Sequence, residues 1–269
     1  MTTTTSTTGG CTSCGCTAST LERVRYYPRQ LLTADDMSAE QQYVLQKDRN
    51  HVRNLHGWGV VCGMEVVASA TESSPWRVRV CPGHVVTPQG CEIQLAELAT
   101  LDLATGAQTA VDPCAGAWPC PPTGAMPGGK PGQVIQVYVA IRYAECPSRP
   151  ERVLPAGCGC DETACEHSRI RDAFELGMLW ELPASHAAAV RADKVWVKAF
   201  RQWQNQSAED PATPAPAPAC PVCPDDPWVV LARVALPAKG APLADGAITY
   251  HGRRVLYSVS AIQALLTVP

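Results

Sequence analysis

Proline and glycine interrupt this chain so often that long helices have little room to form. The sequence holds 24 prolines and 20 glycines among 269 residues, about one residue in six. Proline removes a backbone donor and glycine costs entropy in a regular element, so this frequency favours short strands joined by turns. We expect an α+β protein: mainly antiparallel β meander or sandwich, with one long N-terminal helix and proline-rich loops.

The stretch between Pro28 and Gly57 holds neither residue and is the exception. Thr33 and Asp36 have the spacing of a hydroxyl and a carboxylate that cap a helix N-terminus. Apolar residues then recur seven or eight positions apart, on one helical face. They are Met37, Val44, Leu45, Val52 and Leu55. The sequence predicts a helix of about 22 residues that ends before Gly57.

Strand patterns follow this helix. Residues 60–67, 76–80 and 91–95 alternate in polarity, and Pro82-Gly83 and Pro88-Gln89-Gly90 supply turns. We interpret residues 21–110 as a helix plus β-meander module with one buried face. Cys62 is then a small buried residue of a strand. Residues 1–20 are expected to be a flexible tail.

The second half is predicted to be β-rich as well. A Pro/Gly-rich loop over 111–132 leads into a portion over 133–269 that shares the first core or packs closely against it. The proline-rich arm at 211–224 is expected to be extended, like polyproline II. The expected strands are 134–143, 174–182 and 228–236, and the expected helices are 187–203 and 258–266.

Composition and motifs exclude several functions. The net charge of −3 provides no basic field for nucleic acid. The Thr-rich start, Met1 to Gly10, lacks the features of a secretory signal. No apolar run reaches the roughly 18 residues of a membrane span, so we expect a cytoplasmic protein without direct membrane insertion. We find no nucleophile elbow, HExxH helix or P-loop, and we expect no enzymatic activity.

Four cysteines form the strongest candidate site for a ligand. Cys158, Cys160 and Cys165 lie within eight residues on a glycine-bent loop, and Cys146 precedes them. Four thiolates make a tetrahedral zinc site, so zinc is the one cofactor that the sequence suggests. A disulfide cluster that pins a long loop is the alternative. Both interpretations stay open.

The predicted N-terminal helix is also a candidate partner-binding surface. Lys47, Arg49 and Arg53 make it locally basic, and Tyr26, Tyr27 and Trp58 bracket it. Aromatic rings and arginine are enriched in the cores of protein interfaces.

Three stretches of the chain resemble a family of proteins encoded with phage-tail-like contractile injection systems. They are 25–43 (RYYPRQLLTADDMSAEQQY), 55–66 (LHGWGVVCGMEV) and 80–93 (VCPGHVVTPQGCEI). The resemblance implies a non-enzymatic structural component near the baseplate, which assembles with other particle subunits and with copies of itself. The particle would be assembled in the cytoplasm and then released or docked at a membrane.

Two other functional classes remain as alternatives. A metal- or redox-active cysteine-rich protein is suggested by the cysteines above and by Cys220-Pro-Val-Cys223. A receptor- or carbohydrate-binding β domain is suggested by the tryptophans, which include Trp58, Trp76, Trp118 and Trp228.

Overall fold

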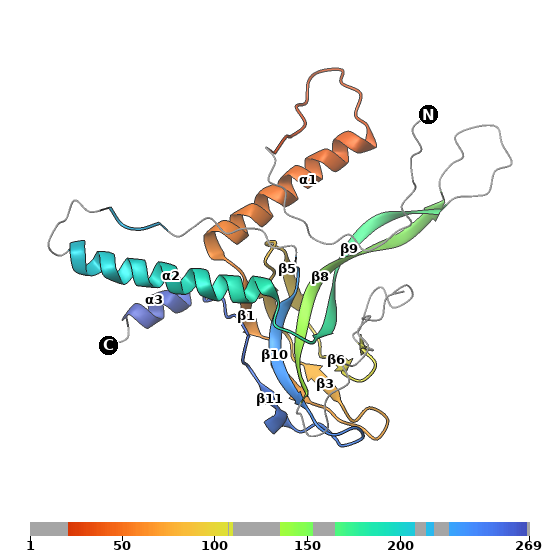
Figure 1. Ribbon diagram of the computed structural model, residues 1–269. Coiled ribbons are helices and arrows are strands. Elements are labelled where there is room, and N and C mark those ends of the chain that lie inside the picture. Colours follow the sequence, from red (N-terminus) through yellow and green to blue (C-terminus); the bar gives the residue numbers. More distant parts are fainter. Residues whose placement is uncertain are drawn as a thin grey trace, which may run out of the picture.

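The computed structural model describes residues 21–106, 108–109, 135–152, 165–207, 214–217 and 226–267. The fold is α+β and its sheets are antiparallel, as the sequence predicts (Figure 1). The predicted tail at 1–20 and the predicted loop at 111–132 lie outside the described residues. Of the proline-rich arm, only residues 214–217 are described.

Helix α1 (Ala34–His51) begins as predicted. The Thr33 hydroxyl accepts a hydrogen bond from the Asp36 N–H at 3.2 Å, and the Asp36 carboxylate accepts one from the Thr33 N–H at 2.9 Å. These hydrogen bonds hold the pKa of Asp36 below its usual value. A π-helical turn (Val52–His56) continues α1 and ends at Gly57, whose φ of 86° favours glycine.

The strands β1 to β7, which follow α1, form two separate sheets. One has the order β1-β4-β5 and the other β2-β3-β6-β7. Their bounds are β1 (Gly59–Gly63), β2 (Val66–Ala68), β3 (Arg77–Val80), β4 (Gly83–Val86), β5 (Glu92–Leu95), β6 (Ala99–Asp102) and β7 (Gln108–Thr109).

The prediction of one strand over residues 60–67 is therefore wrong. Gly63 and Met64 both have positive φ, 60° and 56°, so the chain turns there and passes from one sheet to the other. Cys62, predicted to be buried, is an exposed free thiol just before this turn. The meander is thus split across two sheets.

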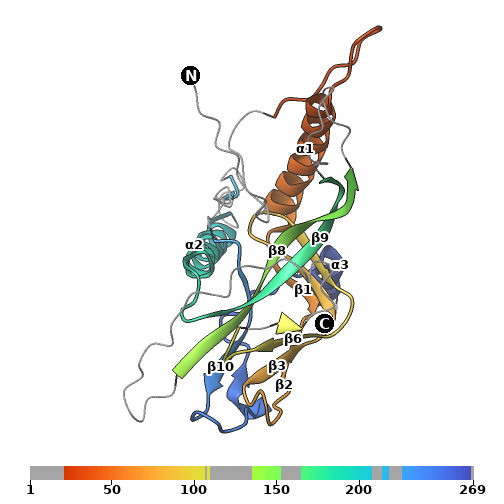
Figure 2. The same ribbon diagram turned by 90° about the vertical axis from the view of Figure 1, so that its right-hand side faces the viewer.

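The third sheet has the order β11-β10-β8-β9. Its strands are β8 (Ile135–Arg152), β9 (Cys165–Leu179), β10 (Val229–Leu236) and β11 (Ile248–Thr249). β9 pairs with β8 from end to end, from Leu179 opposite Tyr138 to Cys165 opposite Arg152. The far half of this hairpin extends beyond the body of the protein, on the same side as α1 (Figure 2).

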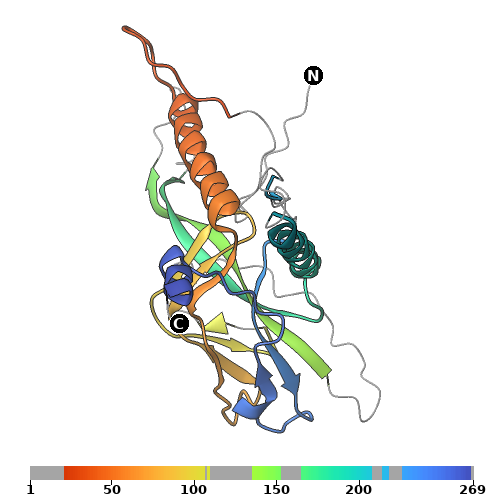
Figure 3. The ribbon, with the colours of Figure 1, turned by 90° about the vertical axis from the view of Figure 1, so that its left-hand side faces the viewer.

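One hydrophobic core draws on all three sheets. Val60, Val78, Ile141 and Leu231 are fully buried members of it, and they come from both halves of the chain. Helices α2 (Ala184–Ser207) and α3 (Val259–Thr267) lie outside the sheets, where helices were predicted. Figure 3 shows α1 and α2 as separate projections from the body. No helix in the described ranges combines the length and apolar character needed to cross a bilayer.

His186 fixes the start of α2 to this core. Its Nδ1 lies 3.1 Å from the Gly252 carbonyl oxygen, and its Nε2 accepts a hydrogen bond from the Val230 N–H at 3.3 Å. Burial lowers the pKa of His186 below the usual 6.5, so the imidazole is neutral. A neutral ring protonated at Nδ1 can donate to Gly252 and accept from Val230, and its Nε2 also lies 3.3 Å from the Trp228 carbonyl oxygen.

Gly90 lies in the β4–β5 turn and allows that turn to approach the C-terminal part of α1 closely. Its φ is 89°, and a Cβ at this position would collide with the backbone carbonyl of Arg49. We expect Gly90→Ala to destabilise the fold by about 3 kcal/mol, because strain and collision add.

Two other glycines serve as controls for Gly90→Ala in urea unfolding. Gly240 has a φ of 85° with open space around it, so Gly240→Ala isolates the backbone strain, about 1 kcal/mol. Gly246 has neither a positive φ nor a close neighbour, so Gly246→Ala is expected to be near neutral. Equal losses for Gly90→Ala and Gly240→Ala would contradict the close approach to α1.

Candidate functional site

Helix α1 turns its apolar stripe to solvent and its polar stripe toward the protein. Met37, Val44 and Leu45 are 52%, 57% and 43% exposed. The half-buried positions recur every three or four residues on a different side and are all polar or tyrosine: Asp36, Glu40, Tyr43, Gln46, Arg49 and Asn50. A surface helix of a globular protein normally has the opposite arrangement.

The exposed apolar surface continues beyond both ends of α1. Before the helix, Tyr26, Tyr27 and Leu31 are all more than half exposed. After it, Leu55 is 71% exposed. Scattered apolar side chains on a surface are ordinary, but a contiguous row along one projecting element is typical of an interaction site.

Charged and aromatic side chains clamp the base of α1 to the β8–β9 hairpin. Arg49 Nη2 lies 3.3 Å from Glu145 Oε1, and both side chains are less than one-fifth exposed. The Arg49 guanidinium also lies over the Tyr143 ring, 5.8 Å from its centroid. This clamp fixes which side of α1 faces the protein.

Tyr143 extends the clamp across the hairpin. Its hydroxyl donates to Asp172 Oδ1 at 2.6 Å and lies 3.2 Å from Glu145 Oε1. Burial first, and then the two carboxylates, raise the pKa of Tyr143 well above its usual 10.0. The phenol therefore stays protonated and serves as a hydrogen-bond donor at any physiological pH.

The structure separates the six predicted partner-binding residues into two groups. Tyr26, Tyr27 and Lys47 are exposed, as a partner surface requires. Arg49 is engaged in the clamp, and Arg53 donates to Asn50 Oδ1 on the same inner side of α1. The prediction that these two arginines face a partner is corrected, because both side chains are partly buried and bonded to groups of their own chain.

Trp58 is the second correction. It is only 8% exposed and belongs to the core. The ring meets His186 edge to face at 4.7 Å between centroids, and the Arg254 guanidinium lies 5.0 Å from its centroid. Trp58 therefore joins β1 to the start of α2 and is not available to a partner.

Of the four cysteines predicted as zinc ligands, the structure describes the side chain of Cys146 alone. Cys146 is buried and disulfide-bonded, so the structure favours the disulfide interpretation over a zinc thiolate at this residue. Cys158, Cys160 and the side chain of Cys165 lie outside the described part of the chain, where zinc stays a prediction. Among the side chains that are described, no three His, Cys, Asp or Glu residues gather as metal ligands.

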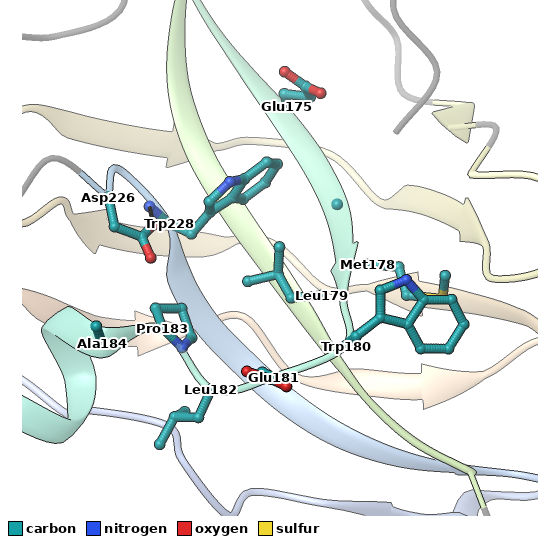
Figure 4. A pocket seen from close by; sticks show the side chains of 11 residues that line it. Glu175, Met178, Leu179, Trp180, Glu181, Leu182, Pro183, Ala184, Asp226 and Trp228 are labelled. Atoms are coloured by element: carbon teal, nitrogen blue, oxygen red, sulfur yellow. Dashed lines mark hydrogen bonds between the residues drawn. The ribbon is translucent and has the colours of Figure 1, made fainter. Parts of the chain in front are cut away.

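A pocket of about 520 Å³ lies where β9 leads into α2 (Figure 4). Three of its polar and aromatic lining residues, Glu175, Asp226 and Trp228, are engaged within the chain. Glu175 pairs with Arg142, and Asp226 accepts from the Trp228 N–H at 3.0 Å. The Trp228 ring packs on Gly177 and under the Arg142 guanidinium.

The carbohydrate alternative gains no support from the tryptophans that suggested it. Trp58 and Trp76 are buried, and Trp118 lies outside the described residues. Trp228 is half-buried in the contacts above. An exposed flat ring, which stacking on a sugar needs, is not found among the three described ones.

Sequence reasoning identified α1 but missed the residues that orient it. Tyr143, Glu145 and Asp172 carry no motif, and only their pairing across the hairpin brings them together. The signal that was available is the apolar spacing, of which Met37, Val44, Leu45 and Leu55 are exposed, whereas Val52 is buried in the core.

No protein family model matches this chain, and no curated protein sequence matches it.

We predict that Arg49→Met lowers the free energy of unfolding by about 1–3 kcal/mol, because Glu145 then stays largely buried without its cation. Hydrogen exchange of the α1 amides should accelerate, since the clamp orients this helix. Lys47→Met is the matched control, because Lys47 is exposed and its ammonium lies over the Tyr43 ring, 5.7 Å from its centroid, instead of pairing with a buried carboxylate. Equal effects of the two substitutions would contradict the role of the clamp.

Proposed function

We propose that this protein is a structural assembly subunit and that α1 is its contact with a second copy of the chain. One observation carries the proposal: Met37, Val44 and Leu45 of α1 are exposed, while Arg49 on its polar side is held by Glu145 and Tyr143 of the protein's own hairpin. The stripe cannot turn inward without breaking the Arg49–Glu145 clamp. A partner is therefore the available way to remove it from water.

The apolar side chains supply a favourable free energy for this contact. Full burial of a Val, Leu or Met side chain contributes about 1.5–3 kcal/mol. Met37, Val44 and Leu45 are about half exposed, so each has roughly half of that left to gain. A twofold interface counts each contribution twice, because the same patch is present on both copies.

The charges of α1 favour an antiparallel pair of copies. Asp35 is exposed in the first turn of α1, and Lys47 and His51 are exposed in its last two turns. Two antiparallel helices place the acidic end of one against the basic end of the other, and their dipoles are also opposed. The same patch then meets itself around a twofold axis, as the commonest oligomers require.

The finer proposal is that the assembly is a phage-tail-like contractile injection particle and that this chain is a component near its baseplate. The resemblance of residues 25–43, 55–66 and 80–93 supports it. The shape also supports it, because α1 and the far half of the β8–β9 hairpin extend from the same side of the body (Figures 1 and 2). Projections of this kind suit a subunit that reaches several neighbours.

Substitution of Val44 by glutamate tests the contact between copies. We expect the wild-type chain to show a concentration-dependent mass in sedimentation equilibrium. Val44→Glu should weaken self-association about tenfold or more, because a twofold interface receives two buried carboxylates. Gln42→Glu adds the same charge on another side of α1 and should leave the association unchanged. A wild-type chain that remains monomeric would contradict the proposal, as would equal effects of the two variants.

Fractionation of cells that naturally carry the gene tests the finer proposal. The chain should sediment with sheathed particles that are visible by negative-stain electron microscopy, and mass spectrometry should find it at a fixed ratio to the sheath protein. Recovery of intact particles without the chain would contradict a place in the particle. That result would leave the self-association of α1 untouched.

A further inference from the structure

Helix α2 carries three aromatic rings in a row along one side. Trp196 and Phe200 are stacked with their centroids 5.2 Å apart, and Phe200 and Trp203 follow at 5.4 Å. We name these three residues the aromatic ladder. Every residue from Arg191 to Gln206 is exposed or half-buried, so this part of α2 lies away from the core (Figure 3). The ladder therefore takes no part in packing the sheets.

A short piece of the proline-rich arm touches this ladder. The indole N–H of Trp196 donates to the carbonyl oxygen of Pro216 at 3.3 Å. Pro216 is half-buried, whereas Pro214, Ala215 and Ala217 are exposed. An aromatic ring that also offers a donor to a proline carbonyl is the usual way in which proteins recognise extended proline-rich segments.

The sequence around Pro216 restricts the segment to that extended form. Pro214, Pro216 and Pro218 alternate with alanine, and we name residues 214–218 the Pro-Ala repeat. Each proline fixes its own φ near −65°, and each residue before a proline is excluded from the helical region. Little backbone entropy is left to lose, so binding costs less than it would for a flexible segment.

The spacing of the ladder matches the spacing of the repeat. Residues four apart in an α-helix are separated by about 6 Å along the axis. Residues two apart in polyproline II are separated by about 6 Å as well. Trp196 and Phe200 can therefore receive two successive prolines. Among the described residues 214–217, only Pro216 is partly shielded, while Pro214, the proline expected next to Phe200, is exposed.

We infer that the aromatic ladder is a binding site for a Pro-x-Pro segment and that its occupant in the assembled protein is the Pro-Ala repeat of a second copy. The contact of Trp196 with Pro216 of its own chain is the same interaction made incompletely. A repeat from a second copy engages both rings, because it does not have to double back from the end of α2. Exchange of an identical segment between copies needs no new binding chemistry.

Two complementary variants test the exchange, both in the Val44→Glu background so that α1 does not contribute. One carries Trp196→Ala and Phe200→Ala and keeps the repeat. The other carries Pro214→Ser, Pro216→Ser and Pro218→Ser and keeps the ladder. We expect the equimolar mixture to form a heterodimer in sedimentation velocity while each variant alone stays monomeric. A mixture that sediments as monomer, with both variants folded by circular dichroism, overturns the exchange.

A peptide titration tests the ladder directly and requires no second chain. A fluorescein-labelled peptide of residues 211–219 should show a saturable rise in fluorescence anisotropy when it is mixed with the repeat-deficient variant. Adding Trp196→Phe keeps the ring but removes the donor and should weaken binding several-fold, whereas Gln202→Ala, an exposed position off the ladder, should have no effect. A peptide with serine in place of proline is the control ligand. Equal responses to the two peptides overturn the ladder as a binding site and leave the proposal for α1 intact.

Discussion

The ion pair between Arg49 and Glu145 determines how the projecting helix α1 is oriented. Both side chains are largely removed from water, and a cation in such a place needs its partner. Helix α1 must therefore present its polar side to the hairpin, and Met37, Val44 and Leu45 face solvent as a consequence. An electrostatic requirement on one side of a helix thus leaves a hydrophobic surface on the other. The proposed assembly contact follows from this orientation of α1.

The architecture combines one core with elements that extend beyond it. Three small sheets share their buried side chains, while α1, α2 and the far half of the β8–β9 hairpin reach outward (Figure 1). Each projection is anchored near the core: α1 by Arg49 and Gly90, and α2 by His186. Both helices carry apolar or aromatic side chains that do not pack into the core. Elements of this kind are suited to contacts between molecules.

Much of the fold was predictable because its signals are local. The capping pair Thr33 and Asp36, the seven-residue spacing along α1 and the alternation in β8, β9 and β10 all depend on residues a few positions apart. The split of residues 60–67 between two sheets was not predictable. Alternation alone continues through Gly63 and Met64, and only competition between two sheets for the same core shows that the chain must turn there.

Local patterns were enough to place the three helices and parts of β3, β5, β8, β9 and β10, since periodicity and capping act within a few residues. They did not reveal strands such as β4 and β6, the direction in which the exposed apolar residues of α1 point, the burial of Trp58, or the contact of Trp196 with Pro216. These outcomes depend on groups distant in the chain, such as Arg49 and Glu145, 96 positions apart. A side chain takes its role from the neighbours that folding brings to it, and no spacing along the chain specifies them.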